Sequence, residues 1–406
     1  MNYLGIDVSK STSRYVLLDN DGEEAIKPFT LHNDQTGFLK LTERLKELKL
    51  SCDNLLIGIE ATGIWWENLY CLLTEKSFKV IVLNPHQTNK FREALRFKAK
   101  TDDIDAYVIA GLLRSSKHAA SYIPEENIQV LREITKLRFS LVKDRQNYER
   151  HVCSLLALLF PEYEKTALKN PFTVSSLTIL KAYPTAKHLA EAKTKHIEKI
   201  VRSIKGNNFN IDEIQRLIET AKNSIYSGRA KDARGLNLNI LLTQAETTAN
   251  AIAQLDQRIN DILSPQNPDD ANSFPGANLL SIPGVGPKTL AAVLSAVGSN
   301  GQAFPDGKHL IGHVGFFPKI YDSGETHRAN IISSRGPKYL RRALYIAAVA
   351  CLKHNPEFKA LYGRKISQGK TAKQALVYVA QKLAHLCLSM LKSGESYNPS
   401  RLFMPV

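Results

Sequence analysis

The 406-residue sequence predicts an α/β N-terminal domain, an all-α middle and a mainly α C-terminal domain. Short β-rich runs alternate with helical patterns over the first 120 or so residues, and only the helical period continues to about residue 263. A mostly helical pattern resumes after a proline-rich break. A hydrophobic content of 43% with 23% charged residues allows sizeable cores and excludes a disordered or fibrous chain.

The elements of the N-terminal domain follow from residue type and period. Two short runs of β-forming residues separated by KSTS are typical of a hairpin. Two later runs, NLLIGI and FKVIVL, are almost continuously apolar, and the helical pattern between them is typical of a βαβ crossover. We expect strands at residues 3–8, 14–18, 54–59 and 78–83, and helices at residues 37–49, 64–75 and 103–115.

The middle of the chain carries long helical patterns and almost no strand signal. Residues 130–160 are consistent with one helix. Near the end of this region apolar positions follow heptad spacing over three heptads, which suits a short coiled coil and a plain bundle helix about equally. The predicted seam consists of Leu241, Ala245, Thr248, Ile252, Leu255, Ile259 and Ile262.

A stretch with three prolines and no periodicity, residues 264–278, predicts a linker or domain boundary. Beyond it the pattern is helical, apart from an irregular loop expected at residues 306–337. The predicted domains are residues 1–125, 126–264 and 279–406, with the linker at residues 265–278.

Charge gives the first indication of function. The chain holds 54 basic and 39 acidic residues, a net charge of +15, and residues 301–406 alone hold 16 basic against 5 acidic residues. A basic region of this kind implies a polyanionic partner, most often nucleic acid. A merely solubilising surface is the alternative.

The sequence predicts a soluble cytoplasmic protein, associated with the nucleoid and without a membrane partner. The longest apolar runs fall far short of the ~20 residues that cross a bilayer, and the N-terminus MNYLGIDVSK lacks the profile of a signal peptide. The cysteines form no C-x-x-C pairs, so we expect reduced core residues rather than disulfides or zinc ligands. They are Cys52, Cys71, Cys153, Cys351 and Cys387.

Acidic residues occur at three points where a charged side chain is unfavourable unless it has a function. Asp7 interrupts the first predicted strand, Glu60 follows the buried run LLIGI, and three aspartates crowd a helix start in KTDDIDA. The carboxyl ends of adjacent strands converge on one crevice, to which a helix N-terminus can bring further carboxylates. Asp102 and Asp105 share a helix face, whereas Asp103 turns away.

Gathered carboxylates repel one another and therefore indicate hard divalent cations. We predict that Asp7, Glu60, Asp102 and Asp105 hold Mg²⁺, as two ions ~3.5–4 Å apart that activate a nucleophile and stabilise a leaving oxygen in phosphodiester chemistry. The alternative gives each acid an ordinary task, with Asp102 or Asp103 as a helix cap, Glu60 in a turn and Asp7 at a strand end.

Two basic segments are candidates for contacts with a phosphate backbone. The first, NKFREALRFKAK, directly precedes the aspartates and is also explained as a solvated helix face. The second lies at a helix start late in the chain. The basic residues are Lys90, Arg92, Arg96, Lys98 and Lys100 in the first segment and Arg335, Lys338, Arg341 and Arg342 in the second.

Residues 279–298, LLSIPGVGPKTLAAVLSAVG, are similar to a helix-hairpin-helix. In such a motif glycines let backbone N–H groups approach a phosphate and a lysine adds charge, roles that fall here on Gly284, Gly286 and Lys288. An ordinary turn between two helices with a glycine cap is the alternative.

Ser323 lies in a polar D-S-G turn shortly before the second basic segment. Taken alone, it is explained as a turn former. A serine that attacks a phosphodiester needs a base or metal and cationic stabilisation. The following arginines and lysine would supply the cations, and the N-terminal carboxylates would supply the metal across a subunit or domain interface.

Four motifs in order carry a family resemblance: GIDVSK, GIEATG, NPHQTNKFREALRFKAKTDDIDA, and SIPGVGPKTLAAVLSAVG with GFFPKIYDSGETHRANIISSRGPKYLRRAL. Together they resemble the DEDD-type insertion-sequence transposases, the group related to the Piv DNA invertases, over residues 2–120 and 275–390. The resemblance implies a RuvC-like, RNase H-type fold for the N-terminal domain. It also implies that the D-E-D-D tetrad is the set of four carboxylates named above.

The same resemblance implies a chemistry and partners. The family's proposed serine nucleophile corresponds to Ser323, with Ser333 or Ser334 as the fallback. Members move their element through a circular intermediate and are directed to donor and target DNA by a structured non-coding bridge RNA. The active unit would be a homo-oligomer, a dimer or a tetramer, in which the serine of one protomer completes the carboxylate site of another.

The sequence therefore predicts a DNA transposase or recombinase that excises and inserts an insertion sequence under guidance of a bridge RNA. One alternative is a Holliday-junction or structure-specific nuclease, which would use the same carboxylates with water as the nucleophile. Another is a non-catalytic nucleic-acid-binding protein whose acids serve as caps.

Overall fold

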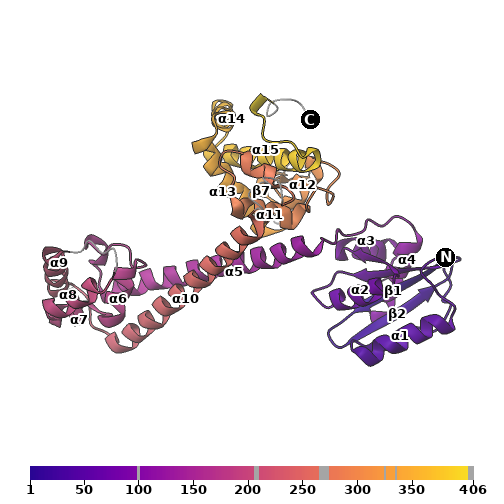
Figure 1. Cartoon of the computed structure of the whole chain (residues 1–406), viewed down its shortest axis with the longest axis horizontal. Coiled ribbons are helices and arrows are strands. Elements are labelled where there is room, and N and C mark those ends of the chain that lie inside the picture. Colours follow the sequence, from indigo (N-terminus) through magenta and orange to yellow (C-terminus); the bar gives the residue numbers. More distant parts are fainter. Residues whose placement is uncertain (98–100, 205–209, 265–273, 324–325, 334–335, 401–406) are drawn as a thin grey trace. The chain divides into compact units, whose positions relative to one another are not determined.

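The computed structural model divides the chain into two compact units, residues 1–123 and 124–406 (Figure 1). No helix in the part of the chain that the structure describes is long and apolar enough to cross a membrane. The structure describes residues 1–97, 101–204, 210–264, 274–323, 326–333 and 336–400, with the backbone alone for residues 318–332.

The first unit is built on a mixed five-stranded sheet in the order β3-β2-β1-β4-β5. Strand β1 pairs antiparallel with β2 and parallel with β4, and β4 pairs parallel with β5. The predicted hairpin and βαβ crossover are confirmed, whereas β3 was not predicted. The strands are β1 (Asn2–Val8), β2 (Thr12–Leu18), β3 (Phe29–His32), β4 (Leu55–Glu60) and β5 (Lys79–Leu83).

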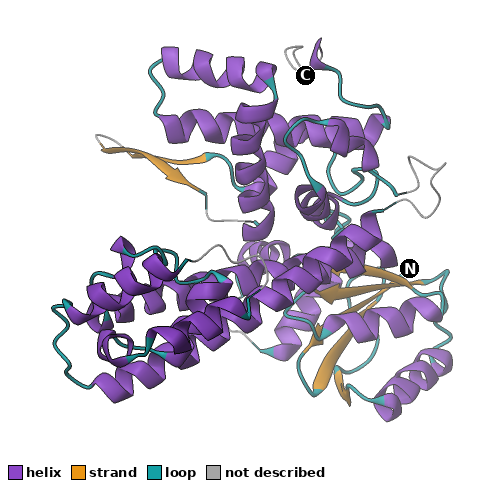
Figure 2. Ribbon diagram, turned by 60° about the vertical axis from the view of Figure 1, so that its left-hand side comes forward, coloured by secondary structure: helices purple, strands orange, loops and turns teal. Residues whose placement is uncertain are grey.

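Helices cover both faces of this sheet (Figure 2). One face packs with α1 and α2 through an apolar cluster that includes Leu4, Leu41 and Leu73. The other face packs against α4, with Val16 beside Ala106. The arrangement is compatible with an RNase H-like domain. The helices are α1 (Gln35–Glu47), α2 (Trp66–Glu75), α3 (Pro85–Ala94) and α4 (Asp102–Arg114).

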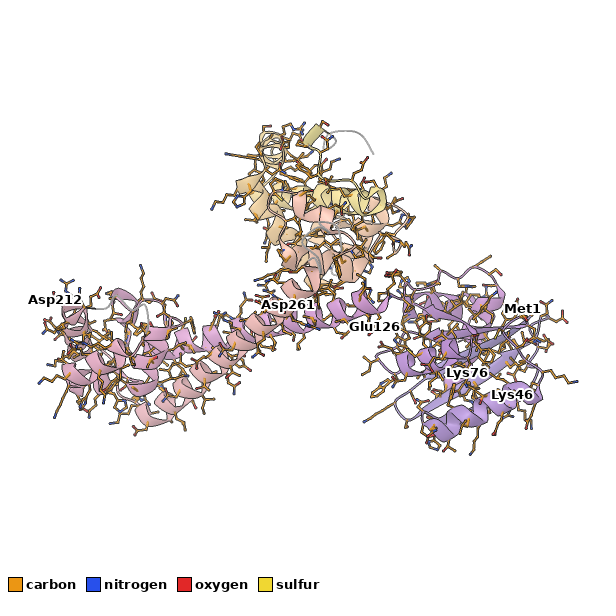
Figure 3. All side chains as sticks on the ribbon, viewed as in Figure 1. Met1, Lys46, Lys76, Glu126, Asp212 and Asp261 are labelled. Atoms are coloured by element: carbon orange, nitrogen blue, oxygen red, sulfur yellow. The ribbon has the colours of Figure 1, made fainter. Side chains whose placement is uncertain are left out.

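Two long helices form the frame of the second unit. Helices α5 (Glu126–Leu159) and α10 (Lys231–Leu263) lie side by side and antiparallel. In Figure 3, Glu126 and Asp261 mark one end of the pair and Asp212 marks the small bundle at the other end. This bundle is formed by η1 (Tyr163–Lys165), α6 (Val174–Ala182), α7 (Ala186–Glu191), α8 (Thr194–Arg202) and α9 (Ile211–Lys222).

The predicted heptad seam of α10 is correct in part. Ala245, Thr248, Ile252 and Ile259 are buried. The other three predicted positions are only half-buried, because the buried stripe runs slightly to one side of the predicted one. Partner α5 of the same chain covers this stripe. The buried stripe of α10 also includes Leu238, Leu242 and Leu263, which are outside the predicted seam.

The prediction of an irregular loop at residues 306–337 is wrong, since this stretch holds helix α12 and an antiparallel hairpin of β6 and β7. Ile320 and Tyr321 before the D-S-G turn and Ile331 and Ile332 after it are residues typical of strands. The C-terminal elements are η2 (Ala277–Ser281), α11 (Pro287–Val297), α12 (Gly307–Val314), β6 (Pro318–Ser323), β7 (Thr326–Ile332), α13 (Lys338–His354), α14 (Pro356–Ser367) and α15 (Ala372–Ser393).

Helix α11 is the centre of the C-terminal core. All its residues from Thr289 to Val297 are buried, among side chains of α5, α13 and α15. Within the predicted linker, residues 265–278, only residues 274–278 are described. The C-terminal helices thus form one core with the near ends of α5 and α10.

Candidate active site

Two of the predicted carboxylates stand at the carboxyl ends of adjacent parallel strands. Ile6 of β1 is in register with Ile59 of β4, so Asp7 and Glu60 are the next residues of the two strands. Both are half-buried. Neighbouring strands lie about 4.8 Å apart, which places the two backbones beside each other.

Glycines let helix α4 lie close against this face of the sheet. A Cβ on Gly5 would clash with the carbonyl oxygen of Ala106, and a Cβ on Gly58 would lie 2.7 Å from Cδ1 of Leu113. Side chains two residues apart on a strand point the same way. The two carboxylates, each two residues beyond one of these glycines, therefore share the face that α4 covers.

The first turn of α4 carries the three predicted aspartates. Thr101 is the N-cap, and its hydroxyl accepts the N–H of Ile104 at 3.3 Å. Asp102 and Asp103 therefore do not cap the helix, although its dipole favours anions at their positions. Asp102 is exposed, whereas the side chain of Asp105 is 18% exposed.

Asp103 pairs with an arginine beside Asp7. Arg14 of β2 is in register with Asp7, and its Nε donates to Oδ1 of Asp103. Its Nη1 donates to the hydroxyl of Thr30 at 2.9 Å. Arg14 thus connects the start of α4 to the sheet next to Asp7, a contact that was not predicted from the sequence.

Helix α3 connects two of the carboxylates. The hydroxyl of Thr88 donates to Oε2 of Glu60 at 2.5 Å, and Nη1 of Arg92 donates to Oδ1 of Asp105 at 2.9 Å. These two residues of α3 are four apart and share one helix face. Thr62 donates to the other oxygen of Glu60 at 2.5 Å. Neither threonine was predicted, although the four-residue spacing from Thr88 to Arg92 is visible in the sequence.

The side chains at this face offer carboxylate and hydroxyl oxygens, the type of ligand that hard divalent cations prefer. Among the residues that the structure describes, no three His, Cys, Asp or Glu side chains lie close enough together to hold a metal ion. The positive charge next to the carboxylates comes instead from Arg14, at Asp103, and from Arg92, at Asp105.

Some of the basic residues predicted before α4 pair with acidic side chains. Lys90 pairs with Glu93 at 2.5 Å, and both side chains are more than 60% exposed. Arg92 pairs with Asp105 as described above. Arg96 follows α3 with a positive φ of 61°. Two further predicted residues, Lys98 and Lys100, lie outside the described residues.

The glycine motif of the second unit leads from η2 into α11. Gly284 has a φ of +101°, and a Cβ there would lie 2.7 Å from the backbone nitrogen of Cys351, so packing on α13 requires this glycine. Gly286 is the N-cap of α11, with open space where its Cβ would be. Lys288 pairs with Asp256 of α10 at 2.7 Å.

The predicted serines lie at and after the hairpin. Ser323 is the last residue of β6 and is in register with Thr326 of β7. Ser333 is 1% exposed, and its N–H donates to the carbonyl of Phe317 at 3.0 Å. Such burial makes Ser333 the weaker candidate for attack on DNA. Ser334 and Arg335 lie outside the described residues.

Helix α13 carries the rest of the second basic segment. Lys338 is exposed at its first turn. Arg341 donates through Nε to the carbonyl of Val314 at 2.8 Å, a contact that ties α13 to the end of α12. Arg342 is half-buried, and its Nη1 lies 3.5 Å from Oε1 of Gln146 on α5.

Comparison with known proteins assigns both ends of the chain. The DEDD transposase model of the IS110 type matches residues 4–161, and the model of the transposase IS116/IS110/IS902 family matches residues 276–363. The chain is 23% identical to the pilin gene-inverting protein of Moraxella lacunata, over 98% of this chain and 97% of that protein.

Two further relatives have similar coverage. The mini-circle putative transposase for IS117 of Streptomyces coelicolor is 25% identical over 100% of this chain and 97% of its own length. The insertion element IS900 uncharacterized 42 kDa protein of Mycobacterium paratuberculosis is 24% identical over 98% of this chain and 97% of its own length. These matches confirm the resemblance drawn from the motifs: the chain belongs to the DEDD-type IS110 family of transposases, enzymes that act on DNA.

Proposed function

We propose that this transposase cuts DNA with Mg²⁺ held by Asp7, Glu60, Asp102 and Asp105 and with Ser323 as the nucleophile. The observation that carries the proposal is the placement of Asp7 and Glu60 side by side at the ends of β1 and β4, on the face covered by α4. Helix α4 begins next to this face, where Asp103 accepts from Arg14 beside Asp7, and α3 connects Glu60 to Asp105.

Binding of Mg²⁺ at this face involves a competition. The guanidinium of Arg92 donates to Oδ1 of Asp105, so a cation held by Asp105 would either use the other carboxylate oxygen or replace this contact. When bound, Mg²⁺ supplies positive charge to the oxygens of the phosphodiester. If a cation replaced its contact with Asp105, Arg92 would be available to bind a phosphate, which is the role predicted for it from the sequence.

The serine step exchanges one phosphate ester bond for another. Oγ of Ser323 loses its proton to a base and forms a bond to phosphorus, while the bond from phosphorus to the leaving deoxyribose oxygen breaks and that oxygen gains a proton. Attack by a hydroxyl of another strand on the phosphoseryl link reverses the step and joins the strands. The place of Ser323 at the end of β6 and the burial of Ser333 support this assignment.

We further propose a structured guide RNA and a homo-oligomeric active unit. The basic excess of the chain supports binding of polyanions, among which are both DNA and RNA. Base pairing with the RNA would then select the DNA sequence, and the protein would contact mainly phosphates and the shape of the duplexes.

The test is strand cleavage of element-junction DNA by the purified full-length protein with Mg²⁺ and the flanking non-coding RNA. Denaturing gels are run with and without protease treatment, so that DNA attached to protein is separated from free product. The variants are Asp102→Ala, Ser323→Ala and, as the matched serine control, Ser333→Ala.

The wild type and Ser333→Ala are expected to give a protease-sensitive adduct, which Ser323→Ala lacks. Asp102→Ala is expected to lose cleavage while it still binds DNA. Free nicked product that persists in Ser323→Ala would instead indicate a metal-dependent nuclease with water as nucleophile. An adduct that remains in Ser323→Ala would exclude this serine.

A further inference from the structure

A cavity of about 210 Å³ lies among α5, α10, α11 and α13 in the second unit. Phe139 and Val142 of α5 and Ala343 and Ile346 of α13 line it with apolar side chains. Ile346 is 54% exposed, a large apolar side chain left open to solvent. Apolar walls of this kind, with a few polar groups, are typical of ligand sites.

Three cations line the same cavity, namely Arg138, Lys288 and Arg342. Arg138 and Lys288 both bind one carboxylate, Asp256 of α10, the lysine at 2.7 Å. Arg342 has no acidic partner among the described residues, and its guanidinium lies over the ring of Phe139, 6.0 Å from the ring centre. The cavity therefore has a surplus of positive charge.

The chain has a glycine near the lining residue Lys288 that the fold does not require. Gly286 stands two residues before Lys288 and has an extended φ of −114°, which any residue adopts. Apart from its two chain neighbours, no residue has an atom within 4 Å of where its Cβ would be. A residue without a side chain leaves the backbone at the start of α11 open to close approach by a ligand.

The two properties of the cavity together select its ligand class. A lone phosphate would leave the apolar walls unused, and an apolar ligand would leave the cations unused. A nucleotide has a flat base for the walls and a phosphate for the cations. Thr289 and Tyr339 add hydroxyls to the lining that can bind the edge of a base.

We propose that this cavity takes one unstacked nucleotide of a bound DNA or RNA strand, with its base against Phe139 and Ile346 and its phosphate on Arg342, the lining cation that has no acidic partner among the described residues. The inference rests on the proposed function, because it requires that the protein bind nucleic acid. Unstacking a base costs a few kcal/mol, which burial of the base against an aromatic ring offsets.

The test uses 2-aminopurine, a fluorescent base whose emission rises when it leaves the stack. It is placed at successive positions of element-junction DNA, single-stranded and duplex, and of the flanking non-coding RNA. Each probe is bound to the full-length protein in EDTA, so that the readout does not depend on cleavage. We expect a rise at a defined position, and the strand that responds identifies the ligand as DNA or RNA.

Two variants block the cavity in different ways. Ala343→Leu fills it, and Ile346→Asp places a negative charge at an exposed position of its wall, where folding is tolerant. Both are expected to abolish the rise in emission. Arg342→Gln is expected to lower affinity about tenfold. The matched control, Lys353→Gln, removes one charge from an exposed position of the same helix and keeps the rise.

A full rise that persists in folded Ala343→Leu and Ile346→Asp would overturn the proposal, and so would wild-type protein that binds the probes without a rise at any position. A rise in EDTA from a protein that fails to cleave with Mg²⁺ would keep the cavity as a nucleotide site and refute the catalytic proposal. Cleavage by a protein that gives no rise would do the reverse.

Discussion

The carboxylate site depends on residues that carry no charge. Gly5 lies so close to α4 that a Cβ would clash with the backbone oxygen of Ala106. Backbone in a helix cannot turn aside, whereas the side chain of Leu113 beside Gly58 can adjust. The approach of α4 to Asp7 is therefore more sensitive to substitution at position 5 than at position 58.

Gly5→Ala is expected to lower the free energy of unfolding by about 3 kcal/mol or more, and Gly58→Ala by about 1–2 kcal/mol, as overpacking of a core does. Urea denaturation of both variants measures this difference. An equal or smaller loss in Gly5→Ala would mean that α4 can move away from β1 without cost.

Buried thiols provide a second test at single residues. Burial raises the pKa of Cys351 and of Cys387 to about 12, while Cys71 and Cys153 are exposed. Burial and the nearby Glu164 and Glu149 also raise the pKa of Cys153. Because the thiolate is the reactive form, a thiol reagent at neutral pH is expected to label the native protein at Cys71 and more slowly at Cys153, and to label the buried pair only after unfolding. Peptide mass spectrometry reads the labels, and native labelling of Cys351 would contradict the packing of α13.

The sequence indicated the acids of the site but not the groups that bind them. Asp7 and Glu60 were found because strand ends are visible in local patterns. Thr88 donates to an acid 28 residues away, and Arg14 to one 89 residues away. Such pairs depend on how α3 and α4 pack on the sheet, which local periodicity does not contain.

For whole elements too, the sequence predicts the helical period but not which face packs against a neighbour. The helical period of α10 was correct, but its buried stripe passes through Leu238 and Leu242 rather than Leu241. Which side of a helix is covered depends on its partners, here α5 and the small bundle. The hairpin of β6 and β7 was missed because turn residues near Ser323 outweighed the strand-forming residues on either side.

A charged contact joins three of these elements. Asp256 of α10 accepts from Arg138 of α5 and Lys288 of α11. Burial acts to raise the pKa of Asp256, but the two hydrogen bonds outweigh it and hold the pKa below its usual value. A carboxylate of this kind stabilises the fold above its unfolded-state pKa and loses that contribution as the pH falls through its folded-state pKa.

Asp256→Asn is therefore expected to be less stable than the wild type at pH 7, with a difference that narrows as the pH falls below about 3.9, the usual pKa of an aspartate. Urea denaturation at pH 7, 5 and 3 gives the comparison. A difference that stays constant over this range would show that the charge of Asp256 does not hold the three helices together.

Charge is divided unevenly over the whole molecule. Residues 1–123 hold 16 basic and 16 acidic residues, so the net charge of +15 lies entirely in residues 124–406. The unit with the carboxylates therefore has no net attraction for a polyanion. Long-range attraction of nucleic acid is left to the second unit.

A fragment of residues 124–406 is accordingly expected to keep most of the affinity for DNA and its steep dependence on salt, while a fragment of residues 1–123 binds weakly. Fluorescence anisotropy with labelled DNA between about 50 and 200 mM salt gives both slopes. A first unit that alone reproduces the slope of the full chain would contradict this division.

The proposed DNA cleavage depends on the carboxylates at the ends of β1 and β4. Its most direct test is the rate of Mg²⁺-dependent cleavage of element-junction DNA by Asp7→Asn, with Asp103→Asn as a control that makes the same change next to Arg14. We expect Asp7→Asn to lose at least about a hundredfold in rate and Asp103→Asn to stay within a few fold. Cleavage at the wild-type rate by Asp7→Asn would contradict the proposed site.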